Sequence, residues 1–298
     1  MCIRDRFKGT KFLDRFRNIK TFCFDKTGTL TSGKFKLVNV EAIDFDEGKA
    51  LHLARLAEYH SKHPISSAIV DEREDIDKDE IISYTSLSNG VAAETKYGSV
   101  KVVTSDMQSE YKVLDTYLDD KLIAHLYIED EIKDETKKLV TELKERNIKP
   151  VMLTGDTKIY AQKVAHDLGI DSFEAELLPQ DKIKFFEKEQ GHDGLVAFVG
   201  DGINDSPVIK RADIGLSMGA LGSDAAIEAS DIVIMDDRIE KIVNIFDTSQ
   251  FVNKIILENL IFTGIVKAAI IILSLFIQLP LWLAVFGDVG VTLISILN

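Results

Sequence analysis

The sequence predicts an α/β fold: a doubly wound parallel sheet, interrupted by a small α+β domain and followed by a hairpin of two transmembrane helices. Three short apolar runs each end in an acidic turn: 21–24, 149–153 and 195–199. Helical patterns separate these runs: 134–146, 158–168 and 180–188. Such alternation is typical of a parallel sheet covered by helices on both faces. From residue 251 to 298 the chain carries only four charged side chains, which predicts the membrane hairpin.

Composition narrows the class of protein. The chain has 298 residues, with 36 basic and 49 acidic side chains and a net charge of −13. This length suits about two domains with real cores. The acidic balance argues against a general nucleic-acid binder, which needs a basic face. The two cysteines lie far apart in the sequence, which argues against a disulfide scaffold and suits a reducing compartment.

The predicted parallel sheet is built from two separated segments, 10–34 and 119–250. The segment 35–118 lies between them and forms the small domain. Its alternating stretches favour a small antiparallel sheet packed against one helix: strands at 81–84, 91–95 and 100–103, and a helix at 47–59.

Two further stretches receive a simpler interpretation. The charged run 71–80 is expected to be a solvated loop. Residues 1–9 are treated as a leader outside the fold, because the opening run from Met1 to Arg6 has no clear relation to the rest of the sequence.

The tail, residues 251–298, predicts two membrane spans. The stretch 255–277 is nearly continuous apolar sequence and is long enough to cross a hydrocarbon layer of about 30 Å. Pro280 breaks it, and 281–297 is a second apolar run. No cleavable signal precedes the soluble part, so we expect a multi-pass protein of the cell membrane with its soluble domains in the cytosol. The alternative is a pair of buried core helices in a soluble protein.

Carboxylates follow all three predicted strands. Asp25, Asp156 and Asp201 each come directly after, or within three residues of, an apolar run. The carboxyl ends of parallel strands meet at one edge of a sheet, and sites lie at that edge. Because three carboxylates repel one another, the pattern implies a hard divalent cation between them.

The most specific motif is the run from Asp25 to Thr31, which reads DKTGTLT. An aspartate at a strand end, followed by a turn of backbone N–H groups, can attack phosphorus and form an aspartyl phosphate. The run resembles the phosphorylation motif of P-type ATPases, ion pumps built on the haloacid-dehalogenase fold. The resemblance implies that Asp25 is the nucleophile, that Mg²⁺ and ATP are the cofactors, and that 10–34 with 119–250 form the phosphorylation domain.

Other elements of this family occur in order: Thr154-Gly155-Asp156, Lys182, and the run from Gly200 to Pro207. The resemblance implies that Thr154, Lys182 and Asn204 hold phosphoryl oxygens. It implies that Asp25, Asp201 and the backbone carbonyl of Thr27 bind Mg²⁺. The implied catalytic set is Asp25, Lys26, Thr27, Thr154, Gly155, Asp156, Lys182, Asn204 and Asp205. Phosphoryl transfer by such a set rests on positioning and charge neutralisation.

The small domain resembles the nucleotide-binding domain of the heavy-metal-transporting branch. The run from Ser61 to Pro64, preceded by Glu58, resembles its S-x-H-P element. The implied nucleotide-binding residues are Glu58, His63, Pro64 and Gly90; in that branch the corresponding glutamate and histidine line the adenine pocket, so the resemblance implies that Glu58 and His63 bind the base. Ser88 and Thr104 stand where the family commonly has glycine, which weakens the expected nucleotide affinity. Lys133 stands where the family more often has arginine.

The tail narrows the transported ion. Lys267 and Asp288 fall within the two predicted spans, where ionisable residues usually mark a pathway. With Asn259, their spacing resembles the last two helices of zinc-, cadmium- and lead-exporting members. A carboxylate suits Zn²⁺ better than Cu⁺. The resemblance implies that Asp288 binds the transported metal and that Lys267 is its counter-ion.

The leading hypothesis is the catalytic part of an ATP-driven exporter of Zn²⁺, Cd²⁺ or Pb²⁺. Its expected partners are ATP, a divalent heavy-metal ion, the lipid bilayer and an N-terminal part of the same pump. No Thr-Gly-Glu actuator element, no Cys-Pro-Cys helix and no Cys-x-x-Cys element occurs in the sequence, so we expect the chain to be inactive in transport by itself. The alternatives are a membrane-anchored phosphatase of the same fold and a non-catalytic remnant of a pump.

Overall fold

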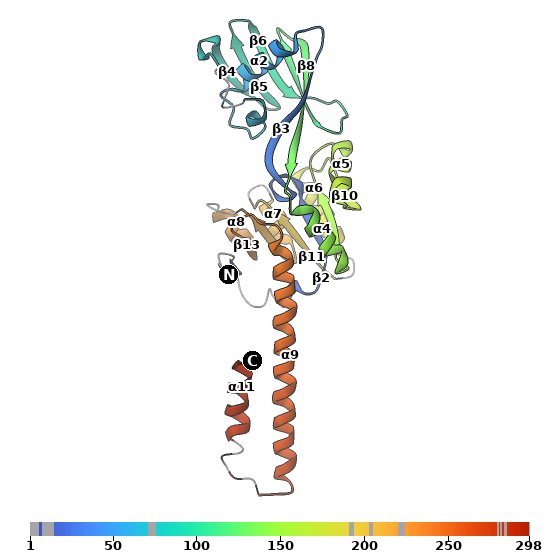
Figure 1. Ribbon diagram of the computed structural model, residues 1–298, viewed down its shortest axis with the longest axis vertical. Coiled ribbons are helices and arrows are strands. Elements are labelled where there is room, and N and C mark those ends of the chain that lie inside the picture. Colours follow the sequence, from blue (N-terminus) through green and yellow to red (C-terminus); the bar gives the residue numbers. More distant parts are fainter. Residues whose placement is uncertain are drawn as a thin grey trace. The chain divides into compact units, whose positions relative to one another are not determined.

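The computed structural model describes residues 6–7, 15–70, 76–190, 194–202, 205–219, 224–278, 280, 282 and 285–297. The chain forms two compact units (Figure 1). The first contains residues 19–241 together with the N-terminal strand, and the second contains residues 9–18 with the C-terminal residues from 242 onward. Both predicted sheets lie in the first unit.

The larger sheet of the first unit has seven strands in the order β1-β13-β12-β11-β2-β9-β10. All of its strand pairs are parallel except that of β1. The predicted runs become its three central strands, β2 (Ile19–Asp25), β9 (Lys149–Leu153) and β11 (Leu195–Gly200). The others are β10 (Ser172–Glu174), β12 (Ile214–Met218) and β13 (Ile232–Ile234). Near-continuous apolar sequence is what a strand buried on both faces requires.

Helices connect these strands. The three predicted helices are α4 (Thr136–Glu145), α5 (Lys158–Leu168) and α6 (Pro179–Glu189). Shorter helices follow β11 and β12: α7 (Ser206–Arg211) and α8 (Asp224–Ala229). Phe186 of α6 packs on Phe198 of β11 in one buried cluster, with ring centroids 6.2 Å apart. This packing fixes α6 against the strand centre, which places its first turn near the carboxyl edge.

The N-terminal strand corrects the treatment of residues 1–9 as a leader outside the fold. β1 (Arg6–Phe7) pairs antiparallel with β13, and its Phe7 lies opposite Ile232. A short antiparallel edge strand protects the open side of a parallel sheet from pairing with another chain. At least these two residues therefore belong to the fold.

The smaller sheet has six antiparallel strands in the order β3-β8-β7-β6-β5-β4. They are β3 (Thr31–Ala42), β4 (Ile81–Leu87), β5 (Gly90–Thr95), β6 (Gly98–Thr104), β7 (Lys112–Leu118) and β8 (Lys121–Ile132). The helices α2 (Glu47–Glu58) and α3 (Ser66–Ile69) complete the domain. The sheet begins before residue 35 and extends past residue 118, because β3 and β8 pair with each other from Ala42 down to Thr31.

Glu80 corrects the expectation that the charged run 71–80 is a solvated loop. Its side chain is buried, with 7% exposed. Lys96 Nζ lies 2.6 Å from its Oε1, and His52 Nε2 lies 2.7 Å from its Oε2. These contacts, with Lys96 first, hold the pKa of Glu80 at about 2, well below its ordinary value. Residues 71–75 of this run lie outside the described residues.

The second unit contains one long helix, α9 (Lys241–Ser274), and the short helix α11 (Val291–Leu297). One window of α9 has a mean hydropathy of 2.1 and no buried residue, so this helix is long and apolar enough to cross a membrane. Of the second expected span, 281–297, the residues that the structure describes are all helical: 282, 285, the π-helical turn η3 (Phe286–Gly290) and α11. Asn259 Nδ2 donates a hydrogen bond of 2.8 Å to the carbonyl of Ser295, which joins α9 to α11.

Candidate active site and nucleotide pocket

Asp25 is the last residue of β2, at the carboxyl edge of the larger sheet. The turn after it, Lys26–Leu30, reverses the chain through Gly28, whose φ of +72° favours glycine. A Cβ at Gly28 would meet the Cβ of Asp201 at 3.9 Å, so the turn and Asp201 lie side by side. Tertiary structure thus brings Asp201, just beyond the end of β11, next to the motif that begins at Asp25.

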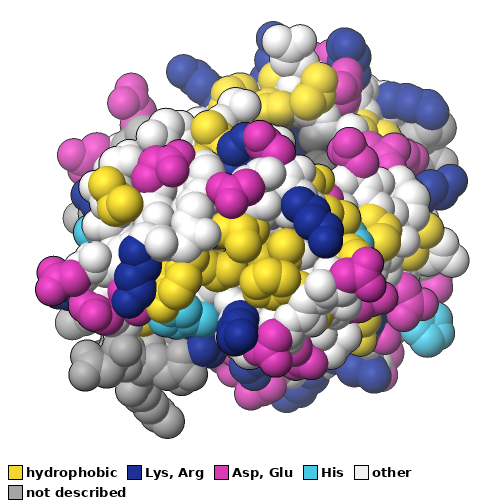
Figure 2. All heavy atoms as spheres, turned by 90° about the horizontal axis from the view of Figure 1, so that it is seen from above, with side chains coloured by type: hydrophobic (Ala, Val, Ile, Leu, Met, Phe, Trp, Pro, Cys, Tyr) yellow, Lys and Arg dark blue, Asp and Glu magenta, His cyan; other side chains and the backbone are white. Residues whose placement is uncertain are grey.

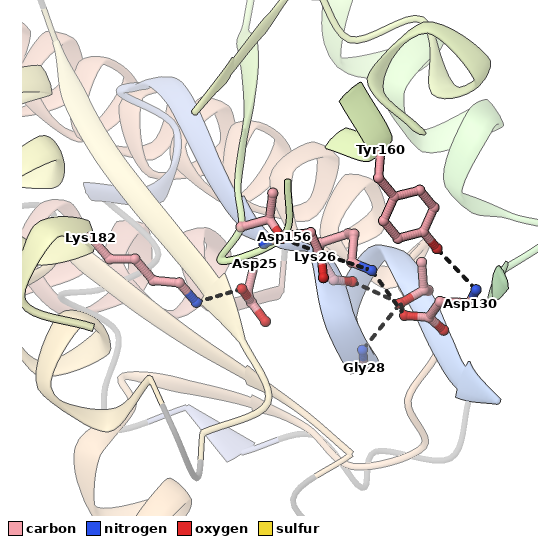
Figure 3. A network of polar contacts seen from close by, with 9 residues as sticks. Asp25, Lys26, Gly28, Asp130, Asp156, Tyr160 and Lys182 are labelled. Carbon is pink, nitrogen blue, oxygen red and sulfur yellow. Dashed lines mark hydrogen bonds and ion pairs between the residues drawn. The ribbon is translucent and has the colours of Figure 1, made fainter. Parts of the chain in front are cut away.

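Lys182 joins the carboxylates at this edge. Its Nζ lies 2.6 Å from Oδ1 of Asp25 and 2.9 Å from Oδ1 of Asp205 (Figure 3 shows the first contact). It comes from the first turn of α6, which Pro179 starts. The two carboxylates lie 157 and 23 residues from Lys182 in the sequence, so one cation gathers groups from three separate elements.

The ionisation of Asp25 depends on this cluster. The pKa of Asp25 is raised to about 7, chiefly by burial and next by the negative charge of Asp205, while Lys182 opposes the shift. Burial likewise raises the pKa of Asp205, which Lys182 again opposes. Asp201 adds a third negative charge nearby. A single lysine does not neutralise three carboxylates, so the charged form of the site calls for another cation.

The residues present fit Mg²⁺, which prefers oxygen ligands. Among the described residues, the buried Oδ2 of Asp205 has no hydrogen-bond partner, and Asp25 and Asp201 flank the same turn. Within that part of the chain no three His, Cys, Asp or Glu side chains form a metal-binding group. Mg²⁺ does not need one, because it keeps several waters and takes few protein ligands beside phosphate oxygens.

Lys26, the residue after Asp25, is buried. Its Nζ is 2.8 Å from Oδ2 of Asp156 and 3.4 Å from Oδ2 of Asp130, and it lies 4.7 Å from the ring centroid of Tyr160 (Figure 3). Thr31 Oγ1 donates to the same oxygen of Asp130 at 2.6 Å. Lys26 therefore holds the turn Lys26–Leu30 against β8 and the loop 154–156, which is a positioning role.

The loop after β9 contains the predicted Thr154, Gly155 and Asp156. Thr154 is buried, and its Oγ1 donates to Oδ2 of Asp156 at 3.0 Å. A Cβ at Gly155 would approach the carbonyl of Leu177 to 3.2 Å, so this position leaves little room for a side chain. The predicted Asn204 lies outside the described residues.

Lys133 connects the turn Lys26–Leu30 to a second loop. Its Nζ donates to the carbonyl of Gly28 at 3.3 Å and lies 2.9 Å from Oδ1 of Asp237. The backbone N–H of Lys133 also donates to the carbonyl of Leu30 at 3.2 Å. A lysine at this position thus contacts the turn directly, without the bidentate fork that arginine would supply.

The smaller domain contains a cavity of about 220 Å³. Glu58, His63 and Gly90, which the sequence singled out, line it; Pro64 does not. The other lining residues are Ser61, Ile65, Ser86, Leu87, Ser88, Asn89, Val91, Val102, Thr104, Lys112 and Leu114. Figure 2 shows this end of the molecule, where acidic and basic side chains intermingle around exposed hydrophobic ones.

The polar groups of the cavity are held in place by neighbours. Ser66 Oγ donates to Oε2 of the buried Glu58 at 2.6 Å. The backbone N–H of Ile65 donates to Nδ1 of His63 at 3.2 Å, which leaves Nε2 as the protonated nitrogen of the neutral ring. Burial and the charge of Lys112 lower the pKa of His63, which favours that neutral ring.

Packing between neighbouring strands explains why glycine occupies position 90, which also lines the cavity. A Cβ there would lie 2.1 Å from the carbonyl oxygen of Val102 on the adjacent strand β6. Thr104 closes the same corner, because its backbone N–H donates to the carbonyl of Asn89 at 2.9 Å. Only glycine lets β5 and β6 approach this closely at the cavity wall.

Several residues of these sites were not found by sequence reasoning. Asp130 and Tyr160 surround Lys26, and Lys112 and Asn89 line the cavity. Asp130 lies three residues before Lys133, at the start of the run Asp130-Glu131-Ile132-Lys133 where the family more often has D-x-x-R, and this spacing is the one signal that could have located it. The others have no motif of their own, because only the pairing and packing of distant elements bring them to these sites.

The comparisons with known proteins agree with this geometry. A model of the haloacid dehalogenase-like hydrolases matches residues 19–213, and the chain belongs to this family. It is 39% identical over 308 residues to a zinc-transporting ATPase of Synechocystis sp., covering 98% of this chain and 43% of that protein. It is 38% identical over 309 residues to the cadmium, zinc and cobalt-transporting ATPase of Bacillus subtilis, with coverage of 98% and 44%. The chain thus spans under half the length of these curated relatives.

Solved structures show the same relationship. The structure of a zinc-transporting PIB-type ATPase in the E2·Pi state matches with a TM-score of 0.81 at 28% identity, covering 98% of this chain and 51% of that chain. The catalytic domain of the CPx-ATPase CopB-B matches with a TM-score of 0.70 at 25% identity, with coverage of 81% and 95%. The predicted haloacid-dehalogenase-like fold and the homology to heavy-metal-transporting P-type ATPases are confirmed.

Proposed function

We propose that this chain is the catalytic part of an ATP-driven heavy-metal pump that works through a phosphate on Asp25. The observation that carries the proposal is the Asp25–Lys182–Asp205 cluster at the carboxyl edge of the sheet, beside Asp201. The larger sheet serves as the phosphorylation domain and the smaller one as the nucleotide-binding domain. The alternative of a membrane-anchored phosphatase does not require the cavity of Glu58 and His63.

The chemistry derives from the positions of these side chains. An ionised Oδ atom of Asp25 attacks the γ-phosphorus of ATP, the bond from this phosphorus to the bridging oxygen breaks, and ADP leaves with those electrons. Lys182 neutralises the incoming phosphoryl oxygens, as its 2.6 Å contact with Asp25 allows. Asp25, Asp201 and the carbonyl of Thr27 would hold Mg²⁺, which would supply further neutralisation and lower the proton affinity of Asp25.

A phosphate mimic tests this assignment on the chain itself. Beryllofluoride added with Mg²⁺ to the chain in detergent should give a bound ¹⁹F resonance, because it forms an acylphosphate analogue on an ionised aspartate. The resonance should be absent in Asp25→Ala and retained in Asp181→Ala, whose carboxylate lies on α6 and pairs with Lys184. A bound resonance in Asp25→Ala, or none in the wild type, would refute the nucleophile.

We further propose that the second unit lies in the cell membrane as part of a multi-pass protein, with the two sheets in the cytosol. Support comes from the apolar, unburied window of α9 and from the hydrogen bond between Asn259 and Ser295. The relatives transport zinc, cadmium or cobalt by name. In this proposal Asp288 binds Zn²⁺, Cd²⁺ or Pb²⁺ and Lys267 replaces the metal as its partner; the side chain of Asp288 is not among those described.

The transport proposal needs a complete pump. This chain joined to the N-terminal half of the Synechocystis relative should hydrolyse ATP in response to Zn²⁺. Asp288→Ala should remove the zinc stimulation while phosphorylation from inorganic phosphate persists, since Asp25 is untouched. Zinc-stimulated turnover in Asp288→Ala, or stimulation by Cu⁺ in its place, would contradict the assigned cargo.

A further inference from the structure

We propose that Lys112 binds the phosphate chain of the nucleotide in the cavity of the smaller domain. The inference rests on the proposed function and adds a residue that the family motifs do not contain. It assigns the charged end of the ligand, whereas Glu58 and His63 were implicated in binding its base. The observations that carry it are the position of Lys112 in the cavity wall and the arrangement of charges around it.

The strand register places Lys112 on the cavity side of the sheet. Lys112 is the first residue of β7, and Leu114, two residues further on, also lines the cavity. Side chains two residues apart in a strand share a face. Leu114 lies opposite Thr104 on the neighbouring strand β6, and Thr104 lines the cavity too. Lys112 therefore lies beyond the end of β6, at the rim beside Thr104.

The charge of Lys112 is not engaged by a carboxylate within its own sheet. Two other lysines near these strands are paired, Lys96 with Glu80 at 2.6 Å and Lys101 with Asp120 at 2.5 Å. Over the described ranges, the side chain of Lys112 forms no hydrogen bond and no ion pair within 4 Å. Glu58 of the same cavity instead accepts from Ser66. Lys112 is half-buried. Burial raises the pKa of Asp156, whereas Lys26 and, after it, the charge of Lys112 lower this pKa, but no ion pair within 4 Å joins Lys112 to Asp156, so an anion that enters the cavity can still contact the ammonium group.

The electrostatics agree with a short distance between Lys112 and the base-binding residue. After burial, the charge of Lys112 is the main reason that the pKa of His63 falls. A neutral His63 beside a fixed cation suits a ligand with an uncharged ring at one end and an anionic chain at the other. A nucleoside triphosphate has this polarity, and a nucleoside has only the uncharged part.

The replacement of two common glycines by Ser88 and Thr104 is consistent with a role for Lys112 in binding phosphate. Backbone N–H groups bind phosphate closely where glycine removes the side chain. Ser88 and Thr104, which stand where the family commonly has glycine, line this cavity, and the N–H of Thr104 already donates to the carbonyl of Asn89. A lysine that reaches the same rim can replace those donors with a charge-assisted contact.

The test separates phosphate contacts from base contacts. The full chain in detergent is titrated with adenosine, AMP, ADP and ATP by calorimetry. Lys112→Met should raise the Kd for ATP about tenfold, the size of one charge-assisted hydrogen bond, and should leave the Kd for adenosine within about twofold. Lys112→Arg should restore most of the ATP affinity. Lys101→Met is the matched control, because Lys101 lies on the adjacent strand, pairs with Asp120 and does not line the cavity.

Two outcomes overturn the inference. If Lys112→Met weakens adenosine and ATP equally, Lys112 only covers the cavity wall. If it changes neither, Lys112 does not contact the ligand. Wild-type chain that binds neither adenosine nor ATP would instead refute the nucleotide-binding function itself, so the two failures are distinguishable.

Discussion

The carboxyl edge of the larger sheet and the cavity of the smaller domain differ in how their charged side chains are held. At the edge, Lys182 and Lys26 each contact two carboxylates at distances between 2.6 and 3.4 Å. In the cavity, Glu58 bonds to a hydroxyl and Lys112 has no ion-pair partner in the described part of the chain. The side chains at the edge are therefore already joined in a network of ion pairs. In the cavity, by contrast, Lys112 is a lining cation that forms no ion pair within 4 Å with the described residues.

This difference predicts which of the two regions tolerates amino-acid substitutions without a large loss of stability. A buried charge network is costly to break, because removing one member leaves its partners buried and uncompensated. The cavity has few such couplings, so Ser88 and Thr104 can replace glycines without leaving a buried charge unpaired. Substitutions in the two regions should therefore differ in the size of their effects, with the largest at the edge.

Breaking the buried network at Lys26 should destabilise the larger domain strongly. Lys26→Met removes the cation between Asp130, which is buried, and Asp156, which is partly buried, so that Asp130 loses its nearest positive charge. We expect a loss of about 3–5 kcal/mol in the free energy of unfolding, measured by urea denaturation in detergent. Lys20→Met, at an exposed position on the strand that precedes the turn, should change stability by less than about 0.5 kcal/mol. Equal effects of the two substitutions would mean that the network is not a preformed unit.

Adding a methyl group to the cavity wall at Gly90 should cost less. In Gly90→Ala the new Cβ would lie 2.1 Å from the carbonyl of Val102, so β5 and β6 must separate. We expect a loss of about 1–3 kcal/mol, confined to the smaller domain, with faster amide exchange in β5 and β6. Gly48→Ala is the control, because its nearest contact would be an ordinary 3.5 Å. Unchanged exchange in both strands would show that the wall adapts without strain.

The stability effect of ionising Asp25 should depend on pH. The pKa of Asp25 in the folded protein, about 7, is above its ordinary value of 3.8. Its stabilising contribution is therefore fully present below about pH 4 and is lost as the pH rises through about 7. Asp25→Asn, which cannot ionise, should match the wild type near pH 4 and be more stable by about 1 kcal/mol or more at pH 8 without Mg²⁺.

Adding Mg²⁺ tests the ionisation of Asp25 from the other direction, because the cation should stabilise the ionised carboxylate. Because the cation favours ionised Asp25, it should raise the melting temperature of the wild type more at pH 8 than at pH 5, and should raise that of Asp25→Asn little at either pH. Thermal unfolding curves with and without the ion measure both effects. A stability difference between wild type and Asp25→Asn that stays constant from pH 4 to pH 8 would show that Asp25 does not titrate in this range.

Runs of consecutive residues predicted several features of the candidate site. The run from Asp25 to Thr31 predicted Asp25 as the nucleophile that is proposed above, and the threonine and glycine pattern within it predicted the turn, because these are properties of consecutive residues. The strand–helix alternation predicted the parallel sheet for the same reason. The outer limits of the smaller sheet were harder to predict from the sequence. They are set by the long pairing of β3 with β8, which places Thr31 opposite Ile132 and depends on both strands at once.

The sequence by itself determined which residue types are available at the edge: an aspartate after each apolar run and a lysine at the start of a helix. Tertiary structure alone decided which of them touch. Lys182 meets Asp25 across 157 positions, Lys26 meets Asp130 across 104, and Lys112 reaches the cavity of His63 through strand pairing. The physical reason is that a contact between distant residues depends on the register and packing of several elements together, and no local pattern encodes that arrangement.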